Sequence, residues 1–430
     1  MDGNDLYQAA LTCRHQGRMD EAVKLARRVL SQQRAHPGAL SILGDDALAR
    51  GDNAAAIRHF TQAVKIDPGA KVLFNNLGVA QSRIALFSAA RDNFDNALAL
   101  DPGYAEARQN LAAVLLRLGE WQRGFQEYEG RWGVEPATRF WRPFAARERL
   151  WAMGDAVPPR LRLWGEQGIG DEILHLGGLP ALLRTGTEVV VECDPRLVAP
   201  LARAMPNLVV CPRADPPDAR LIDEDCPHLP VAGLPGRLWA LGLGTDRPLR
   251  YLAPDPHRVA DFRRQLQALG SGPYVGLSWR SKHATLGPVK SLPLDQWGEV
   301  LRHKGVTFVN LQYGDTDADI ATAHARHGAT LHSLPGLDRF NDMDGMLALV
   351  DALDLTLSTS NITAHLAGAL GKECWLLLHH VPFWYWGWTA AAAPFYPSIT
   401  PFRQGAGGAW RGVMQAVGRR FATFAAPAAG

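Results

Sequence analysis

The chain has 430 residues, too many for one compact core, and this length predicts two to four domains. Hydrophobic residues make up 47% and charged residues 20%, a composition that excludes long disorder. Lys and Arg number 45 against 43 Asp and Glu, which argues against a nucleic-acid-binding protein driven by a large basic field.

The two ends of the chain differ in composition. All 13 Trp follow residue 120, whereas only three of the 29 Pro precede it. The first ten residues carry acids and no apolar stretch, which argues against a signal peptide, and no apolar window of about 18 residues predicts a membrane helix. The five Cys form no C-x-x-C pair, so we expect no disulfide framework, no zinc site, and a reduced, cytoplasmic setting.

The first segment, residues 1–132, repeats with a period of 34. The residues that recur are Leu43, Leu77 and Leu111; Gly44 and Gly78; Ala22, Ala56 and Ala90; Phe60 and Phe94; Ala63 and Ala97; and Pro68 and Pro102. The period resembles the tetratricopeptide repeat, with small residues where two helices cross and Pro ending the second helix. We predict an α-solenoid of three to four repeats and a cap. Ala85 departs from the pattern, because its equivalents are Gly17, Gly51 and Gly119.

The repeats allow two interpretations. A helical array of this kind can bind a peptide or a partner protein, or it can simply cap the next domain. Asn75, Asn76 and Asn110 lie on the expected first helices and would face a bound protein, although they are equally compatible with solvated surface. We favour binding of a partner.

After a linker over 133–158, short apolar strands alternate with amphipathic helices. This pattern predicts one α/β domain over 159–252, a second over 253–405, and a closing helix within 406–430 that packs back on them. The expected strands are 161–164, 188–193, 208–211 and 220–222, then 274–279, 307–312, 330–334, 353–357 and 374–378. The helices expected between them include one over 171–183 and one over 294–303. Two such domains turn the carboxyl ends of their strands toward a shared cleft, where ligands of open α/β sheets bind.

The first candidate site follows the first of these strands. Gly168 and Gly170 allow a ligand to approach the backbone and open a helix with free N–H groups. A dinucleotide site is disfavoured, because Ile173 stands where a third glycine belongs and Asp171 would oppose a pyrophosphate. Asp171 suits a general base, held ionised by the helix dipole; a purely structural N-cap is the alternative.

Two further motifs follow strand ends in the second α/β domain. Ser278, Arg280 and Lys290 suit a diphosphate, with a solvated basic loop as the alternative. Hydroxyls and free N–H groups at the start of the helix expected over 363–371 suit an anion, with a plain cap as the alternative. The residues of this third motif are Thr359, Ser360, Asn361, Thr363 and His365.

In this order, the motifs resemble those of tetratricopeptide-linked glycosyltransferases of the GT-B fold. These enzymes are related to the lipopolysaccharide heptosyltransferases and, more distantly, to the O-linked N-acetylglucosamine transferases. The resemblance covers residues 37–425 and rests on Gly-Ile-Gly-Asp-Glu-Ile-Leu-His at 168–175, Gly-Leu-Ser-Trp-Arg at 276–280, Asn-Leu-Gln-Tyr-Gly at 310–314 and Thr-Ala-His-Leu-Ala-Gly-Ala-Leu-Gly at 363–371.

The resemblance implies an α + α/β fold, in which the solenoid precedes a GT-B pair of Rossmann-like domains, acceptor-side first and nucleotide-sugar-binding second. It implies metal-independent, inverting transfer of a sugar from a nucleotide diphosphate, with no cofactor. Asp171 falls on the general-base position, and Gln312 falls near the base and ribose of the donor. The remaining donor-binding residues that it implies are Gly168, Gly170, Ser278, Arg280, Lys290 and the run from Thr359 to His365.

Two departures from the relatives bear on activity. Residues 358–361, Ser-Thr-Ser-Asn, replace the Asp-Thr-Gly of heptosyltransferases, which argues against ADP-heptose as the donor. Phe383 and Tyr385 stand where relatives tend to carry Asp and Arg, which leaves a slow or inactive copy open.

The sequence thus predicts a glycosyltransferase that acts on a hydroxyl of a protein acceptor presented by the repeats. Flagellin or another surface protein is the acceptor that the family suggests. Two alternatives stay open: a non-catalytic tetratricopeptide adaptor with a vestigial GT-B region, and a lipopolysaccharide heptosyltransferase with an N-terminal extension. Neither nucleic acid nor a metal is expected as a partner.

Overall fold

A computed structural model describes residues 2–134, 141–244, 250–283, 285–389 and 392–426 of the chain. The chain forms two compact units, Met1–Arg139 and Phe140–Gly430. The boundary between them falls inside the predicted linker, of which residues 135–140 lie outside the described residues.

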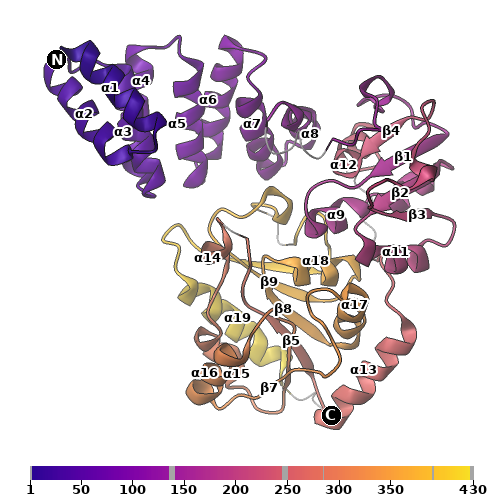
Figure 1. Ribbon diagram of the computed structural model, residues 1–430. Coiled ribbons are helices and arrows are strands. Elements are labelled where there is room, and N and C mark those ends of the chain that lie inside the picture. Colours follow the sequence, from indigo (N-terminus) through magenta and orange to yellow (C-terminus); the bar gives the residue numbers. More distant parts are fainter. Residues whose placement is uncertain (1, 135–140, 245–249, 284, 390–391, 427–430) are drawn as a thin grey trace. The chain divides into compact units, whose positions relative to one another are not determined.

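The first unit is an array of antiparallel helix pairs, drawn in indigo and purple in Figure 1. It confirms the predicted solenoid. The pairs are α1 (Gly3–His15) with α2 (Met19–Gln32), α3 (Pro37–Ala49) with α4 (Asn53–Ile66), α5 (Lys71–Arg83) with α6 (Phe87–Leu100), and α7 (Ala105–Leu118) with α8 (Trp121–Tyr128).

The 34-residue period arises where the two helices of a pair cross. A Cβ atom on Gly44 would lie 2.6 Å from the ring of Phe60, and one on Gly78 would lie 2.7 Å from the ring of Phe94. Both rings are fully buried. Since any side chain at the glycine would displace the ring, glycine and phenylalanine must recur together.

The turns inside the pairs explain the second recurrence. Gly17, Gly51 and Gly119 have φ angles of +74°, +78° and +81°, a region that glycine enters without steric cost. Ala85 adopts the same conformation, with φ at +63°. The fold therefore imposes the left-handed turn even where the sequence supplies a Cβ atom.

The last pair closes the array. Gly124 replaces the alanine of the other repeats, because a Cβ atom there would lie 2.8 Å from the Leu116 side chain. A 3₁₀ turn over Glu129–Gly133 follows α8, and the guanidinium of Arg131 lies 4.5 Å from the ring centroids of both Tyr128 and Trp132. These contacts form the predicted cap.

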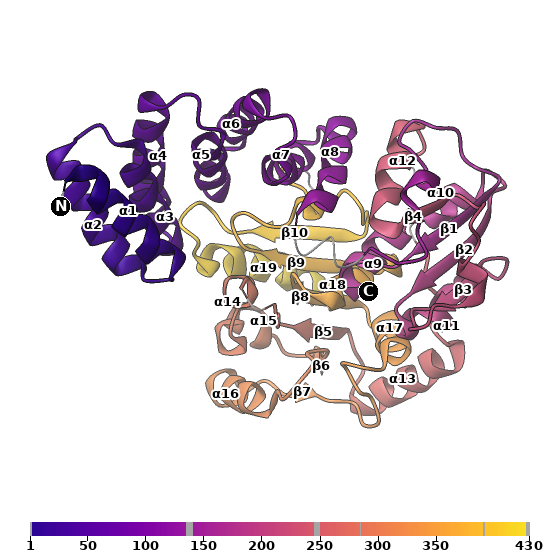
Figure 2. The same ribbon diagram turned by 45° about the horizontal axis from the view of Figure 1, so that its top comes forward.

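The second unit contains two parallel sheets, as the alternating pattern predicts. The first sheet has the strand order β3 (Val209–Pro212), β2 (Glu188–Cys193), β1 (Arg160–Trp164) and β4 (His228–Pro230). The second has the order β10 (Ile399–Arg403), β9 (Cys374–Leu378), β8 (Leu355–Thr359), β5 (Tyr274–Ser278), β6 (Thr307–Asn310) and β7 (Leu331–His332), which can be followed in Figure 2.

Helices connect the strands of each sheet. Around the first sheet they are α9 (Ile169–Leu176), α10 (Leu179–Leu183), α11 (Val198–Ala204) and α12 (Leu234–Ala240). Around the second they are α13 (Pro256–Leu269), α14 (Gly287–Lys290), α15 (Gly298–Leu301), α16 (Asp317–His327), α17 (Met343–Ala352), α18 (Ile362–Ala369) and α19 (Trp410–Phe424). The closing helix α19 buries Val417 and Phe421 in the same core as Val275 and Trp375 of the sheet.

Two strands differ from the prediction. The prediction of a strand over 220–222 is wrong, because Ala219–Leu221 forms a 3₁₀ turn. The fourth strand of the first sheet is instead β4, which lies inside a proline-rich stretch. Its pairing with β1 places Leu229 opposite Leu163, both fully buried, so packing outweighs the proline signal. The sequence analysis does not predict the edge strand β10. Apolar and polar residues alternate only weakly along it, because most of its residues are half-buried.

Two helices also differ. The helix expected over 171–183 begins two residues earlier and divides at Gly177, where the ring of Tyr251 lies 3.2 Å from the position of a Cβ atom. The helix expected over 294–303 divides into a 3₁₀ turn and the short α15.

Candidate functional site

Asp171 lies in the first turn of α9, directly beyond the carboxyl end of β1. The N-cap of α9 is Gly168, so Asp171 is the third helical residue and not the N-cap, and its carboxylate accepts a hydrogen bond from the Gly168 N–H. Burial raises the pKa of Asp171 to about 6, against the opposing effects of that hydrogen bond and of Lys290. Gln167, in the loop before the helix, has a φ of +64°, the kind of strained backbone found at ligand-binding loops.

Lys290 is the cation that faces Asp171. It is only 6% exposed, its ammonium lies 4.8 Å from the ring centroid of Phe383, and burial lowers its pKa to about 8. The negative charge of Asp171 opposes that decrease. Asp171 and Lys290 come from different sheets, so folding brings together two residues that lie 119 positions apart. The charge of each residue acts on the pKa of the other, so the site combines a carboxyl group and a cation.

Four predicted donor-binding residues form one hydrogen-bond network, in which Arg280 takes part through its backbone and the other three through their side chains. The Gln312 side-chain oxygen accepts from the N–H groups of Trp279 (2.9 Å) and Arg280 (2.8 Å) and from the Ser278 hydroxyl (3.2 Å). Asn361, the N-cap of α18, donates to the Ser278 hydroxyl at 2.8 Å and to the Arg280 carbonyl at 3.1 Å. These side chains are buried and hold the loop after β5 in place, so their contribution to a ligand site is to shape the backbone.

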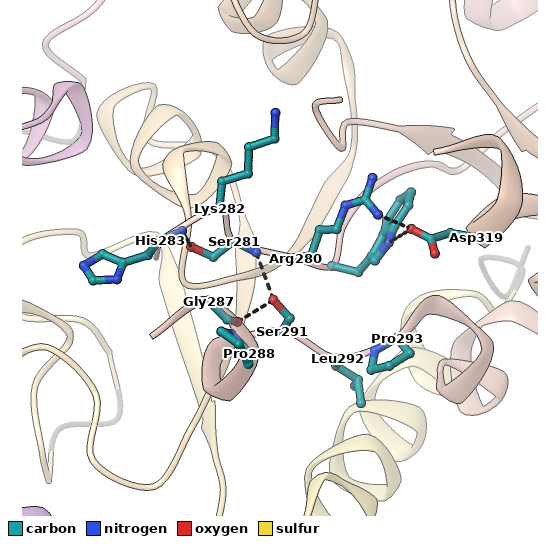
Figure 3. Close-up of a pocket in the computed structure, with 11 residues that line it drawn as sticks. Arg280, Ser281, Lys282, His283, Gly287, Pro288, Ser291, Leu292, Pro293 and Asp319 are labelled. Carbon is teal, nitrogen blue, oxygen red and sulfur yellow. Dashed lines mark hydrogen bonds and ion pairs between the residues drawn. The ribbon is translucent and has the colours of Figure 1, made fainter. Parts of the chain in front are cut away.

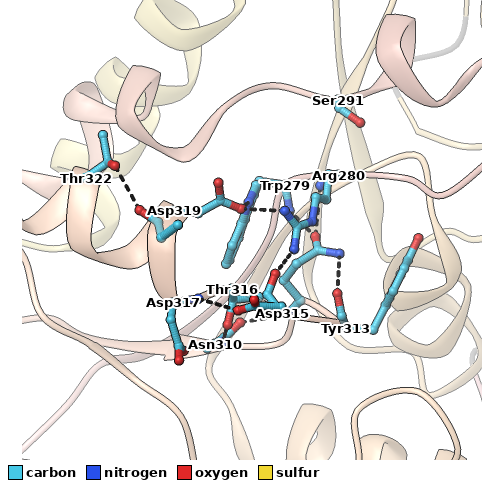
Figure 4. A network of polar contacts seen from close by, with 12 residues as sticks. Trp279, Arg280, Ser291, Asn310, Tyr313, Asp315, Thr316, Asp317, Asp319 and Thr322 are labelled. Carbon is cyan, nitrogen blue, oxygen red and sulfur yellow. Dashed lines mark hydrogen bonds and ion pairs between the residues drawn. The ribbon is translucent and has the colours of Figure 1, made fainter.

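The Arg280 side chain pairs with Asp319, an acid that lies outside the motif of Ser278, Arg280 and Lys290. Its guanidinium donates to Asp319 at 2.8 Å and also to the Asp315 carbonyl, and the Trp279 indole donates to the same Asp319 oxygen at 2.9 Å (Figure 4). Sequence reasoning missed Asp319. The signal was present, because Asp315, Asp317 and Asp319 follow β6, the neighbour of the strand that precedes Arg280.

A pocket of about 370 Å³ opens beside this ion pair. Figure 3 shows Ser291 at its centre, where its hydroxyl accepts from the Ser281 N–H at 3.0 Å and donates to the Gly287 carbonyl at 2.6 Å. The charged and titratable residues that line the pocket are Arg280, Lys282, His283 and Asp319. Cations thus outnumber acids here, which favours an anionic ligand.

The hydroxyls of the third motif are buried at the start of α18. Ser360 accepts a hydrogen bond from the Trp386 indole at 2.9 Å, and Thr359 is fully buried. The Thr363 N–H donates to the Asn361 side chain at 2.9 Å, while the Thr363 hydroxyl has no hydrogen-bond partner among the described residues. The N-terminus of α18 is therefore capped from within the chain.

His365, in the same helix, lies among aromatic rings. The ring centroids of Trp386, Tyr385 and Tyr396 are 4.7, 5.5 and 5.7 Å from that of His365. Burial is the main cause that lowers the pKa of His365 to about 3, followed by the charge of Lys290. The imidazole is neutral at physiological pH.

The aromatic pair noted in the sequence, Phe383 and Tyr385, forms a stack next to this site. The rings of Phe383 and Tyr385 are nearly parallel, with centroids 5.4 Å apart, and Phe383 contacts the Lys290 ammonium on one side and the His283 ring on the other. Tyr385 is buried and Phe383 is half-buried, so this part of the site is aromatic.

The first unit carries a different polar arrangement. Asn110 on α7 donates to Asn75 on α5 at 2.9 Å, Asn75 donates to its neighbour Asn76 at 3.3 Å, and Asn76 donates to Asp45 on α3 at 3.2 Å. Arg14 on α1 pairs with Asp45 at 2.7 Å. The first helices of all four pairs are thus linked by one polar ladder, which contains the three asparagines singled out in the sequence.

Within the described ranges, His, Cys, Asp and Glu side chains form no group that could hold a metal ion. Among the described helices, none combines the length and apolar character that a membrane crossing requires.

No family model matches the chain. Protein FlbA of Caulobacter vibrioides is 29% identical over 440 residues, which cover 97% of this chain and 72% of FlbA. A small glutamine-rich tetratricopeptide repeat-containing protein of Mycosarcoma maydis is 29% identical over 95 residues, 22% of this chain and 27% of that protein. The crystal structure of MamA shares 26% identity over 30% of this chain and 75% of its own, with a TM-score of 0.28.

The likeness to FlbA extends over both units of this chain. The likeness to the Mycosarcoma protein covers about a quarter of either chain. Together with the 34-residue period and the helix pairs, these comparisons establish a tetratricopeptide-containing protein with a parallel-sheet α/β unit.

Proposed function

We propose that this chain binds a partner protein through its repeats, and that the polar ladder from Arg14 to Asn110 is the binding face. The ladder supports this proposal because carboxamides offer both donors and acceptors, and an extended peptide presents both along its main chain. The comparisons favour this protein-binding function more than they favour catalysis, since the Mycosarcoma relative is named for its tetratricopeptide repeats and neither that relative nor FlbA is named as a transferase.

Peptides selected from a random library on the full-length chain test this proposal. We expect Asn75→Ala and Asn110→Ala each to weaken binding of a selected peptide about 3- to 10-fold, the usual cost of one hydrogen bond. Asn96→Ala, on the exposed side of the second helix α6, is the matched control. If the ladder variants bind as tightly as the control, the ladder is not the binding face.

For the α/β unit we propose a GT-B pair that transfers a sugar from a nucleotide diphosphate to a hydroxyl group. The observation that carries this proposal is the placement of Asp171 in the first turn of α9, where Gly170 packs on His365 of α18, together with the buried Lys290 of α14, whose charge acts on Asp171. Asp171 would take the proton of the acceptor hydroxyl as its oxygen attacks the anomeric carbon. The bond from that carbon to the diphosphate would break, and Lys290 would stabilise the departing charge.

The Arg280–Asp319 ion pair modifies the sequence prediction. Because Asp319 already neutralises Arg280, the cations that would hold the donor phosphates in this proposal are Lys290 and Lys282. The half-buried Phe383 ring, which stacks on the buried Tyr385, favours a sugar with an apolar face. The second candidate is an adaptor with an inactive α/β unit. Phe383 and Tyr385 favour it, because they stand where the glycosyltransferases that the sequence resembles tend to carry Asp and Arg.

Calorimetric titration with a panel of nucleoside diphosphates and their sugars separates the two candidates, because an adaptor need bind none of them. Intact-mass analysis of proteins and lipopolysaccharide from cells with and without the gene then identifies the acceptor class. Asp171→Asn should lower turnover by about 10²–10⁴-fold while nucleotide binding persists. Unchanged turnover would rule out Asp171 as the base, and a mass change confined to lipopolysaccharide would replace the protein acceptor with a glycolipid.

A further inference from the structure

Three buried side chains form a hydrogen-bonded chain behind the candidate base. The Tyr251 hydroxyl donates to the Ile173 carbonyl of α9 at 2.7 Å, the two phenols of Tyr251 and Tyr396 hydrogen-bond each other, and the Tyr396 hydroxyl lies 2.9 Å from Nδ1 of His365. None of the three side chains is more than 4% exposed. The chain runs from the last turn of α9 to α18.

The direction of each hydrogen bond in this series can be assigned, because the series begins at a backbone carbonyl and a carbonyl oxygen can only accept a hydrogen bond. Tyr251 has one proton and donates it to Ile173, so its oxygen must accept the proton of Tyr396. The Tyr396 oxygen must then accept from Nδ1–H of His365. A neutral imidazole carries one proton, so Nε2 is left as an unprotonated acceptor.

The Nε2 edge of the His365 ring faces the start of α9. A Cβ atom on Gly170 would lie 3.3 Å from Cδ2 and 3.6 Å from Nε2 of His365, so the ring packs directly on the residue before Asp171. This close contact also gives Gly170 a reason to be glycine, beyond approach of a ligand.

Charged and titratable groups reach this region from several elements. Lys290 and His175 act electrostatically on His365, while Lys290 and Glu166 act on Asp171, and the charge of Asp171 acts on Tyr396. The ring of Tyr385 packs on His365 as well.

We propose that the Tyr251–Tyr396–His365 chain is a positioning device for Asp171: it fixes a lone pair, and not an N–H group, beside the first turn of α9. The ring contacts Gly170, the residue before Asp171, so the tautomer decides whether a donor or an acceptor lies against the start of the helix that carries the base. A donor there would favour the ionised carboxylate, whereas a lone pair keeps the proton affinity of Asp171 high. His365 thereby acquires a role distinct from donor binding. Its value for catalysis rests on the proposed sugar transfer, but the tautomer itself does not.

Nitrogen-15 NMR of the histidine-labelled, full-length protein tests the tautomer without any substrate. We expect an unprotonated Nε2 and a protonated Nδ1 on His365 between pH 5 and 8, assigned by comparison with His365→Gln. A protonated Nε2 in the wild type overturns the proposal, and so does a His365 that becomes cationic in this range.

The variant Tyr251→Phe tests the hydrogen-bonded series at the residue farthest from His365. Without that hydroxyl, the Tyr396 proton is free to turn to Nδ1, so we expect His365 to switch to the Nε2–H form. The titration midpoint of Asp171, about 6 in the wild type, should then fall by about one pH unit in carboxyl carbon-13 NMR. Tyr385→Phe, which removes a hydroxyl from a ring packed on the face of His365, is the matched control and should change neither reading.

A Tyr251→Phe protein that keeps the wild-type tautomer and midpoint contradicts the proposal. If the variant does not fold, the wild-type spectrum still decides the tautomer. Neither measurement uses a nucleotide or an acceptor. The proposed tautomer can therefore be correct when the proposed sugar transfer is wrong, and the sugar transfer can be correct when the tautomer is wrong.

Discussion

At the scale of single residues, Asp171 and Lys290 are ionisable groups whose burial costs stability. Burial raises the pKa of Asp171 and lowers that of Lys290, so the fold disfavours the charged form of both. For Asp171, the stabilising effect of a raised pKa is fully present below its ordinary value near 3.8 and is lost as the pH rises to about 6. The native state therefore loses stability over this range because of Asp171.

We predict that Asp171→Asn raises the free energy of unfolding at pH 7 by about 2 kcal/mol, because the amide keeps the shape of the protonated acid without its charge. At pH 3.5 the difference should vanish. Urea unfolding at both pH values measures this, with the surface variant Asp261→Asn as a control. Equal stabilities at pH 7 would mean that the carboxylate is well solvated.

At the scale of elements, the repeats show how a backbone conformation can persist without the residue that suits it best. Ala85 has φ at +63° in the turn before α6, where the equivalent turns use Gly17, Gly51 and Gly119. A left-handed conformation costs a residue with a Cβ atom about 1–2 kcal/mol. The packing of α5 on α6, with Gly78 against Phe94, outweighs that cost.

Ala85→Gly should therefore stabilise the first unit by about 0.5–1 kcal/mol, after the greater freedom of glycine in the unfolded chain is allowed for. Gly51→Ala is the reverse substitution at the equivalent turn of another helix pair. Its φ is +78° and a Cβ atom there meets nothing within 4 Å, so only backbone strain opposes the change, and we expect a loss of similar size. Thermal unfolding followed by circular dichroism measures both, and a stabilising Gly51→Ala would contradict the strain argument.

At the scale of the whole molecule, the chain holds separate cores. Leu6, Val29 and Ile42 belong to a buried cluster of the first unit, whereas Val275 and Trp375 belong to one in the second. Of the 13 Trp residues, only Trp121 and Trp132 precede the boundary between the units. The two units should consequently report on their unfolding with different signals.

We predict two unfolding steps, of which tryptophan fluorescence follows mainly the one in the second unit, while circular dichroism follows both. Gly78→Ala, which would push on the Phe94 ring, should shift only the helix-rich step detected by circular dichroism. Its control is Gly305→Ala in the second unit, where a Cβ atom meets nothing within 4 Å and strain at a φ of +77° should shift only the fluorescence step. A single step shared by both signals and both variants would contradict independent cores.

Sequence reasoning succeeded where neighbours along the chain decide the structure. The helix pairs, the cap and most strands of the two sheets follow from local periodicity, as do the positions of the motifs at strand ends. It failed where distant contacts outweigh a local signal. The strand β4 forms among prolines, where Leu229 pairs with the buried Leu163. The helix that contains Asp171 ends before Gly177, a position where the Tyr251 ring, distant in sequence, leaves no room for a side chain.

The contrast in composition between the first 120 residues and the rest already separated a repeat array from an α/β region, because small residues at helix crossings and apolar strands are both local patterns. The sequence alone also marked Asp171, Lys290 and His365 as candidates. Only the tertiary structure decided what surrounds them: Lys290 beside Asp171, Asp319 on Arg280, and two tyrosines that orient His365. Ion pairing, burial and the direction of a proton depend on groups far apart along the chain, and no periodicity records them.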